Sequence, residues 1–251
     1  MIELARDGAV AWLRLARPEK LNALDRSLTA ALDEALDRVS AMRDVTVVVL
    51  AARGRAFCAG NDVREMATLS TREAEELAQR QAALMDRFGR LAQVTIAAID
   101  GHALGGGLML ALAQDLRIAS DRARFGLPEV TLGFNPAYGI ARLLDVVAGG
   151  HARDLLLTGR TIRASDALRM GVVNRVVAPP TLEGSASAWA AEIARAPGNA
   201  LALTKKIVAT IRDGGEAREP QSYAAALGTP ESRERLRAFL ERRNTLRGEE
   251  R

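Results

Sequence analysis

The hydrophobic positions of the chain follow two periods, one typical of strands and one typical of helices. Residues 2–15 alternate like two short strands joined at a tight turn, which predicts a hairpin. Continuous apolar runs at 45–51 and 94–99 predict strands buried on both faces, as in a parallel sheet. Apolar residues recur at helical spacing over 27–42 and 72–92. The first hundred residues are therefore predicted to alternate between strands and helices.

The same alternation continues to about residue 180, and only helical patterns follow it. Further strands are expected over 116–119, 123–126, 161–163 and 172–177, and further helices over 107–114, 140–147, 152–158, 164–170, 181–195, 198–213, 218–227 and 230–243. Alternating strands and helices predict an α/β core. We therefore divide the chain into a core over 1–190 and a helical region over 191–251, which we expect to make oligomer contacts and to cover the active site.

Composition and charge exclude several classes of protein. Of 251 residues, 48% are hydrophobic and 26% are charged, as in ordinary globular domains. No apolar run is long enough to predict a membrane span, and the N-terminus does not resemble a signal peptide. The net charge of +4 is spread along the chain, so no nucleic-acid partner is expected. A single cysteine, Cys58, excludes an internal disulfide and a cysteine metal cluster, and we expect a reducing, cytoplasmic location.

Two glycine-centred segments carry the strongest chemical signal. One is Phe57–Asp62 (FCAGND) and the other is Gly101–Gly107 (GHALGGG), and each follows an apolar strand and precedes a helical stretch. Glycine allows main-chain N–H groups to approach a ligand closely. Two such turns could aim two N–H donors at one oxygen that becomes negative during a reaction, which is the layout of an oxyanion hole. An enzyme is the first hypothesis.

Six segments in order then support a family resemblance. The chain resembles the crotonase (enoyl-CoA hydratase/isomerase) superfamily in RPEKLNAL (17–24), FCAGNDVREM (57–66), IDGHALGGGLMLALA (99–113), FGLPE followed by LG (125–133), LLLTGRTIRASDALRMGVVNRVV (155–177) and AFLERR (238–243). The resemblance implies a spiral of β-β-α units with a C-terminal helical region. It also implies a homotrimer or a dimer of trimers, and an acyl-CoA thioester substrate.

Carried onto this sequence, the resemblance assigns a role to individual residues. The backbone N–H groups of Asn61 and Gly106 would be the oxyanion donors, and Glu129 would be the catalytic acid/base. The positions assigned to substrate binding are Lys20, at the nucleotide end of CoA, Ala59, Gly60, Asp62 and Val63, along the pantetheine path, and Ala23, Gly105, Met109, Pro128 and Tyr138. We expect no metal, and no cofactor other than the CoA of the substrate.

Met109 departs from the pattern of the hydratases. These relatives have a second glutamate two residues after the last glycine, where this chain has a methionine. Methionine cannot hold or activate water, and as a residue type it is usually core filler. Adding water needs a group that activates it and a group that protonates carbon, whereas moving a double bond needs one base that returns its proton nearby. The sequence favours 3-enoyl-CoA to 2-enoyl-CoA isomerisation, with hydration of 2-enoyl-CoA in fatty-acid or aromatic-acid degradation as the alternative.

Other interpretations of these residues stay open. Glu129 could be a surface carboxylate or a helix-start charge, and Asp62 could serve as a helix cap. Asn135 and Tyr138 lie in a loop about one residue shorter than the usual P-G-A-G-G run, and either could orient a ligand. Loss of the second glutamate also allows a protein of another class, one that binds acyl-CoA without turnover.

Overall fold

The structure is a computed structural model that describes residues 1–216 and 218–249. The chain forms two compact units, Met1–Lys205 and Lys206–Arg251. The first unit contains every strand of the described residues, so the account of the fold concerns this unit alone. The roles expected of the C-terminal helical region, in assembly and in covering the active site, stay predictions.

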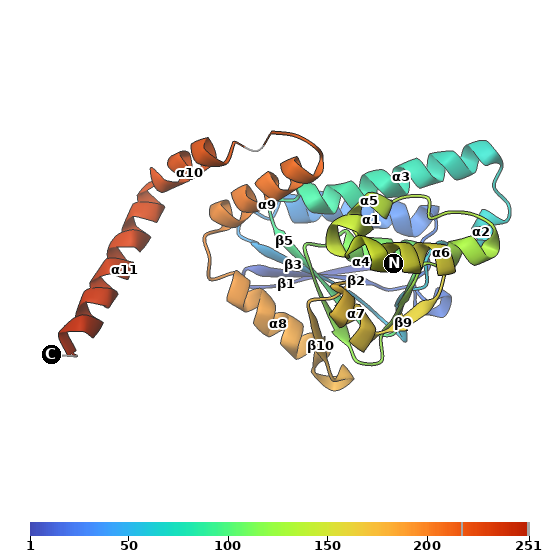
Figure 1. Cartoon of the computed structure of the whole chain (residues 1–251), viewed down its shortest axis with the longest axis horizontal. Helices are drawn as coiled ribbons and strands as arrows, with labels where there is room; N and C mark the ends of the chain where they lie inside the picture. Colours follow the sequence, from blue (N-terminus) through green and yellow to red (C-terminus); the bar gives the residue numbers. More distant parts are fainter. Residues whose placement is uncertain (217, 250–251) are drawn as a thin grey trace. The chain divides into compact units, whose positions relative to one another are not determined.

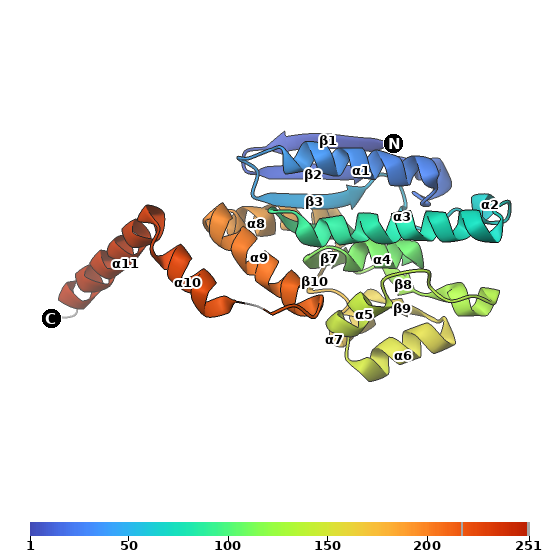
Figure 2. The ribbon, with the colours of Figure 1, turned by 90° about the horizontal axis from the view of Figure 1, so that it is seen from above.

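A six-stranded sheet is the frame of the first unit, and β1, β2 and β3 lie side by side at one edge of it (Figure 2). β1 and β2 form the expected antiparallel hairpin, and all other neighbours in the sheet are parallel. In spatial order the strands are β1 (Ile2–Asp7), β2 (Val10–Leu15), β3 (Val47–Ala52), β5 (Val94–Ile99), β7 (Leu116–Ser120) and β10 (Arg175–Val177). All six residues of β5 are buried, as its continuous apolar run predicts.

A second sheet of four short strands carries the glycine segments. Its order is β4 (Ala56–Cys58), β6 (His102–Leu104), β8 (Arg124–Gly126) and β9 (Thr161–Arg163). The hydrophobic pattern predicts no separate strand at β4 or β6, because three residues are too few to show a period. Gly101 allows these two strands to approach: its φ is +69°, and a Cβ there would lie 2.1 Å from the carbonyl oxygen of Arg55.

Long and short strands follow one another in a repeated order. β3 leads to β4, β5 leads to β6 and β7 leads to β8, and each pair is followed by a helix. Because the long strands are parallel neighbours in one sheet and the short strands in the other, each repeat stacks on the one before it. This arrangement is the spiral of β-β-α units that the family resemblance implies.

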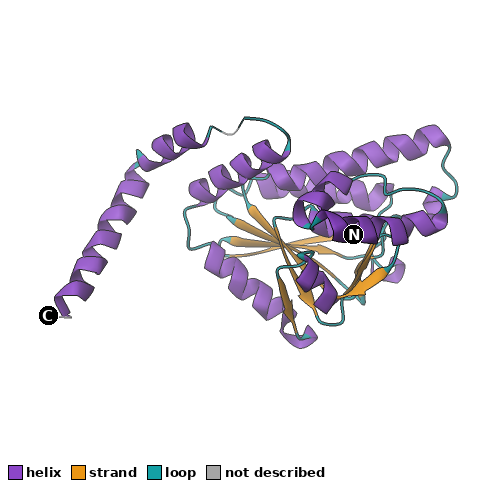
Figure 3. Ribbon diagram, viewed as in Figure 1, coloured by secondary structure: helices purple, strands orange, loops and turns teal. Residues whose placement is uncertain are grey.

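Helices surround the strands in the first unit (Figures 1 and 3). They are α1 (Arg26–Ser40), α2 (Val63–Met66), α3 (Thr71–Arg90), α4 (Gly106–Leu112), α5 (Ile140–Val146), α6 (Gly149–Thr158), α7 (Ala164–Met170), α8 (Leu182–Ile193) and α9 (Gly198–Arg212). Three 3₁₀ turns accompany them, η1 (Pro18–Lys20), η2 (Pro128–Leu132) and η3 (Pro179–Thr181). The last residues of α9 belong to the second unit, which also contains α10 (Glu219–Leu227) and α11 (Pro230–Glu249).

Polar caps fix where α1 and α3 begin. Asp25 accepts a hydrogen bond from Leu28 N at 2.7 Å, and Ser70 forms a reciprocal capping box with Glu73.

Two hydrophobic clusters hold the six-stranded sheet between helical layers. The larger cluster joins leucines of α1 to Phe88 of α3 and continues over one face of the sheet to α4. The smaller cluster joins Trp12 and Val49, on the opposite face, to Trp189 of α8. α4 is buried along its whole length, so the second glycine segment is anchored in the larger cluster.

The structure shortens one expected strand and assigns Glu129 to a 3₁₀ turn. The strand expected over 172–177 is confined to Arg175–Val177, because Arg117 holds the preceding residues: its Nε donates to Val172 O and its backbone N to Asn174 Oδ1. Glu129 lies in the first turn of η2, which begins at Pro128 because the proline ring fixes φ at a helical value. Among the described residues, no helix is both long and apolar enough to cross a membrane.

Candidate active site

The two glycine segments meet at the ends of β4 and β6. A Cβ on Gly107 would lie 2.1 Å from Cys58 O, so only glycine lets α4 begin this close to β4. Gly105 takes a φ of +52° at the N-terminal end of α4, and its N–H donates to Gly126 O at 2.9 Å. Gly60, on the first segment, has a φ of +101°. The sharp turns that the glycines predict are therefore present, and they face one another.

The two backbone N–H groups assigned to the oxyanion hole are close together and unpaired. A Cβ built on Gly60, the neighbour of Asn61, would lie only 3.6 Å from Gly106 N. Among the described residues, no acceptor takes a hydrogen bond from the N–H of either Asn61 or Gly106. The Gly106 N–H lies in the first turn of α4, where no earlier carbonyl is within reach. Both groups are free to donate to a ligand oxygen.

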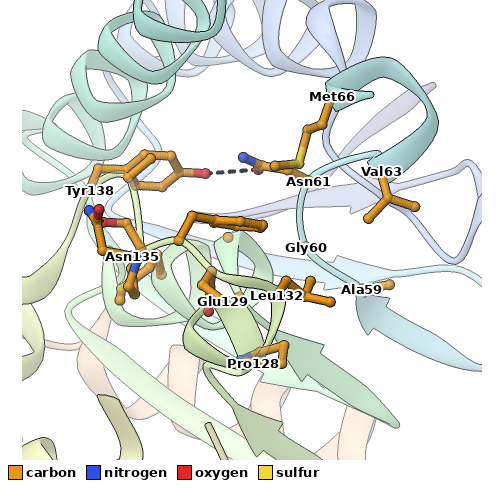
Figure 4. A pocket seen from close by; sticks show the side chains of 16 residues that line it. Ala59, Gly60, Asn61, Val63, Met66, Pro128, Glu129, Leu132, Asn135 and Tyr138 are labelled. Carbon is orange, nitrogen blue, oxygen red and sulfur yellow. Dashed lines mark hydrogen bonds between the residues drawn. The ribbon is translucent and has the colours of Figure 1, made fainter. Parts of the chain in front are cut away.

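A cavity of about 120 Å³ opens beside these donors (Figure 4). Most of its wall is apolar, and the polar side chains in it are Asn61, Glu129, Asn135 and Tyr138. Its lining residues are Ala59, Gly60, Asn61, Val63, Met66, Gly105, Gly106, Met109, Pro128, Glu129, Leu132, Phe134, Asn135, Pro136, Ala137 and Tyr138.

Glu129 contributes the single carboxylate of this cavity. A Cβ on Gly105 would lie 2.8 Å from Glu129 Oε1, so the carboxyl group rests against the second glycine turn. Glu129 Oε2 is buried and has no hydrogen-bond partner in the described part of the chain. Burial raises the pKa of Glu129 above its ordinary value, because the charged form loses hydration. A carboxyl group in these surroundings is suited to accept and return a proton.

Met109 and Tyr138 occupy the wall where a second carboxylate could have stood. Met109 is 1% exposed, and a Cβ on Gly139 would lie 2.6 Å from its sulfur. The neighbouring Tyr138 donates a hydrogen bond from its hydroxyl to Asn61 Oδ1 at 3.2 Å (Figure 4). Burial raises the pKa of the Tyr138 hydroxyl, and the nearby Cys58 and Glu129 raise it further, so this group stays neutral. The wall therefore has hydrogen-bonding groups but no second base.

Three residues assigned to substrate binding lie outside the cavity lining. Lys20 is exposed in η1, and Ala23 follows it and donates its N–H to Lys20 O at 3.0 Å. Asp62 caps α2 by accepting from Arg64 N at 3.0 Å, as the capping interpretation predicts, and it also pairs with Arg17. Their proposed contacts to CoA stay predictions.

Sequence reasoning assigned no role to five other lining residues. These are Met66, Leu132, Phe134, Pro136 and Ala137. Each lies within a few positions of a selected motif, so the signal available was proximity to Asp62 or Glu129 along the chain. Their orientation depends on how α2 and the loop after η2 fold back over the glycine turns.

Cys58 lies beside the site but takes no part in it. Its thiol is fully buried in β4, and burial raises its pKa to about 12. A thiol that stays protonated is a poor nucleophile. Across the described residues 1–216 and 218–249, no group of His, Cys, Asp and Glu side chains is placed to hold a metal ion.

Comparison with known proteins identifies the scaffold. The family model for enoyl-CoA hydratase/isomerase matches residues 5–247. The chain belongs to this family. This enoyl-CoA hydratase/isomerase family member is 34% identical over 246 residues to a short-chain-enoyl-CoA hydratase of Clostridium acetobutylicum, covering 96% of this chain and 94% of that protein.

Solved structures agree with that assignment. The enoyl-CoA hydratase of Bacillus anthracis matches with a TM-score of 0.91 at 33% identity, over 96% of each chain. The enoyl-CoA hydratase of Mycobacterium smegmatis matches with a TM-score of 0.88, also at 33% identity over 96% of each chain. The expectations of a crotonase-type fold and of an enzyme are confirmed.

Proposed function

We propose that this family member moves a double bond in acyl-CoA thioesters, converting 3-enoyl-CoA to 2-enoyl-CoA. In this proposal the thioester carbonyl oxygen accepts hydrogen bonds from the N–H groups of Asn61 and Gly106. The two donors stabilise the negative charge that develops on this oxygen, and losing one such donor typically costs about 3 kcal/mol of transition-state stabilisation. Both N–H groups are free to donate, and a Cβ built on Gly60, the neighbour of Asn61, would lie 3.6 Å from Gly106 N, which supports this role.

Glu129 would carry the proton. Its carboxylate takes a proton from C2 of the 3-enoyl chain, and the electron pair delocalises over the C3–C4 double bond and the thioester oxygen. The same carboxyl group returns the proton to C4, which leaves the double bond between C2 and C3. One residue is then both base and acid, and no water, metal or redox step enters the balance. Burial of Glu129 without a partner for Oε2 supports this assignment.

Met109 is the observation that carries the preference for isomerisation. Hydration adds a hydroxyl to C3 and a proton to C2, so it uses an activated water as well as a proton donor. The side chain of Met109 is buried against Gly139 and cannot activate water. Glu129 is the one carboxylate among the cavity-lining residues.

Hydration of 2-enoyl-CoA is the second candidate, and the names of the relatives favour it. The Clostridium acetobutylicum relative is named a short-chain-enoyl-CoA hydratase, and both solved structures described above are named enoyl-CoA hydratases. For this candidate Glu129 alone would have to activate the water and protonate C2.

Further proposals follow from the family resemblance. The substrate is an acyl-CoA thioester, and its CoA is the only cofactor-like group that the reaction uses. The protein assembles as a homotrimer or a dimer of trimers and is located in the cytoplasm. A role in binding acyl-CoA without turnover is disfavoured, since Glu129 and both donor segments are retained together around one cavity.

A panel of 2-enoyl-CoA and 3-enoyl-CoA esters tests the reaction, with products identified by mass and chromatographic position. Isomerisation leaves the mass unchanged and moves the chromatographic peak, whereas hydration adds the mass of one water. Rapid gain of water with 2-enoyl-CoA would refute the preference for isomerisation. Binding of every ester without any product would refute turnover.

The role of Glu129 is tested by Glu129→Gln. Removing the single proton carrier should lower turnover by at least about 10²-fold. The matched control is Glu34→Gln, because Glu34 is exposed on α1 and is absent from the cavity lining. If Glu129→Gln kept the turnover of the control variant, another group would have to be the base.

A further inference from the structure

The hydrogen bond between Tyr138 and Asn61 lies directly over the second oxyanion donor residue. A Cβ placed on Gly106 would be 2.6 Å from Asn61 Oδ1 and 2.7 Å from Tyr138 Oη. The two oxygens are therefore held together against the same backbone atom, in space that only glycine leaves open. Figure 4 shows the bond reaching across the cavity wall from the loop of Tyr138 to the first glycine segment.

The backbone around Asn61 is held from one side by Leu24. The N–H of Leu24 donates to Gly60 O at 2.8 Å, and Leu24 O accepts from Asp62 N at 2.8 Å. These bonds fix the outer edge of the segment and leave the N–H of Asn61 unpaired. Within the described chain, Tyr138 is the one hydrogen-bond partner of the Asn61 side chain. The segment is thus held at two points, by Leu24 at its outer edge and by Tyr138 on the cavity side.

The residue after Tyr138, Gly139, packs against Met109. Gly139 has a φ of +82°, and a Cβ there would lie 2.6, 3.1 and 3.3 Å from the Sδ, Cγ and Cβ of Met109. Glycine at this position lets the chain turn tightly over the methionine and begin α5. Burial fixes the sulfur-bearing side chain, since Met109 is 1% exposed. Contacts therefore run without a break from α4 through Met109, Gly139 and Tyr138 to Asn61.

We propose that Tyr138 is a positioning residue, which acts through the Asn61 side chain to hold the Asn61 N–H in line with the thioester oxygen. This inference rests on the proposed oxyanion hole, and it gives Met109 a positive role as the support of the tyrosine loop. A phenol that stays protonated is a constant donor, so the contact persists across the pH range in which Glu129 titrates. Small errors in the placement of a catalytic group lower the rate far more than they lower binding.

The test compares the wild type with Tyr138→Phe, Asn61→Ala and the double variant. Asn61→Ala keeps the backbone N–H and removes the side-chain acceptor, and Tyr138→Phe removes one oxygen. We expect each single variant to lower kcat by about fivefold to tenfold, the size expected for one neutral hydrogen bond, with KM nearly unchanged. Because both changes remove the same contact, the kcat of the double variant should be no lower than that of the less active single variant. Independent, multiplying effects would overturn the proposal.

A spectroscopic measurement separates positioning from a structural effect. The infrared carbonyl stretch of a bound acyl-CoA labelled with ¹³C at the thioester carbon reports the strength of the hydrogen bonds to that oxygen. We expect a shift to lower frequency in the wild type and a smaller shift in Tyr138→Phe, at an unchanged melting temperature. A full shift in Tyr138→Phe would overturn the proposal, as would a lowered melting temperature that accounts for the lost activity.

The matched control is Ser27→Ala, which also removes a single hydroxyl group. Ser27 is exposed on α1 and is not among the cavity-lining residues, so this variant should behave as the wild type. The carbonyl shift does not depend on which reaction follows. Failure of the proposed isomerisation would appear in the products of the wild type, whereas failure of the positioning role would appear only in the comparison of variants.

Discussion

Gly106→Ala should damage catalysis while leaving the fold intact. The new Cβ would meet Asn61 Oδ1 at 2.6 Å and Tyr138 Oη at 2.7 Å, both shorter than the 3.0 Å below which a Cβ contact is essentially never observed. Both atoms are the far ends of side chains and can move. They must retreat by at least 0.4 and 0.3 Å respectively, the differences between these distances and 3.0 Å. The substitution therefore pushes the side-chain oxygens of Asn61 and Tyr138 away from residue 106 and disturbs the placement of the Asn61 N–H.

The expected magnitudes differ for rate and for stability. Removing an oxyanion donor outright typically costs 10²–10³-fold in kcat. Gly106→Ala keeps both N–H groups and displaces the Tyr138–Asn61 pair, so we expect a loss of about 10-fold, the size expected for one neutral hydrogen bond. The free energy of unfolding should change by about 1 kcal/mol or less. Alanine is favoured over glycine in a helix by about 1 kcal/mol, which offsets the cost of moving two side-chain ends.

Two other glycine variants provide the comparison. In Gly107→Ala the Cβ would lie 2.1 Å from Cys58 O and 2.8 Å from its carbonyl carbon, which are backbone atoms that cannot retreat. This variant should lose about 3 kcal/mol of stability or more, a drop in Tm of roughly 10 °C. Gly150→Ala, in α6, meets no atom within 4 Å and should match the wild type in turnover.

The assay pairs thermal unfolding with steady-state turnover of the acyl-CoA ester identified in the product panel. Wild-type kcat in Gly106→Ala would refute the placement of the oxyanion hole. A melting temperature as low as that of Gly107→Ala would show that the lost activity comes from a disrupted fold. Only low turnover at a nearly unchanged melting temperature agrees with the geometry.

Three further predictions concern buried polar groups. Burial raises the folded-state pKa of Glu129, so the stability linked to its protonated form is lost as pH rises through that pKa. The melting temperature of Glu129→Gln should therefore exceed that of the wild type near neutral pH. If the two proteins had the same melting temperature at neutral as well as at acid pH, this reasoning would be contradicted. Lys205 is 8% exposed, donates to Phe88 O and Gln93 O at 2.8 Å and pairs with Asp115. In chemical unfolding, Lys205→Ala should lower the free energy of unfolding by about 3 kcal/mol, because it leaves the partly buried Asp115 without its cation. The control Lys206→Ala, at an exposed position, should change it little. The Cys58 thiol, whose pKa burial raises to about 12, should react with iodoacetamide only in the unfolded chain, and rapid labelling of the native protein would argue against this burial.

The sequence predicts the elements best where hydrophobic periods are long. The helix expected over 27–42 is observed at Arg26–Ser40, and the strand expected over 94–99 is observed at Val94–Ile99. Short elements escape prediction, as the three-residue strands β4 and β6 illustrate. A period needs several repeats to be visible, whereas the pairing of short strands is decided by neighbours that lie far away in the sequence.

The sequence by itself determined the family, the two glycine turns and the absence of a glutamate at position 109. These are local properties, since a glycine that allows a turn and a methionine that lacks a carboxylate have the same chemistry in any fold. Only the tertiary structure decided that Tyr138 bonds to Asn61 over Gly106 and that Glu129 Oε2 is buried without a partner. Asn61 and Tyr138 are 77 residues apart, and the contact exists because the parallel packing of β4, β6 and β8 brings the ends of three repeats to one cavity. Hydrogen bonding and desolvation depend on distances of a few ångströms, which the order of residues along the chain does not contain.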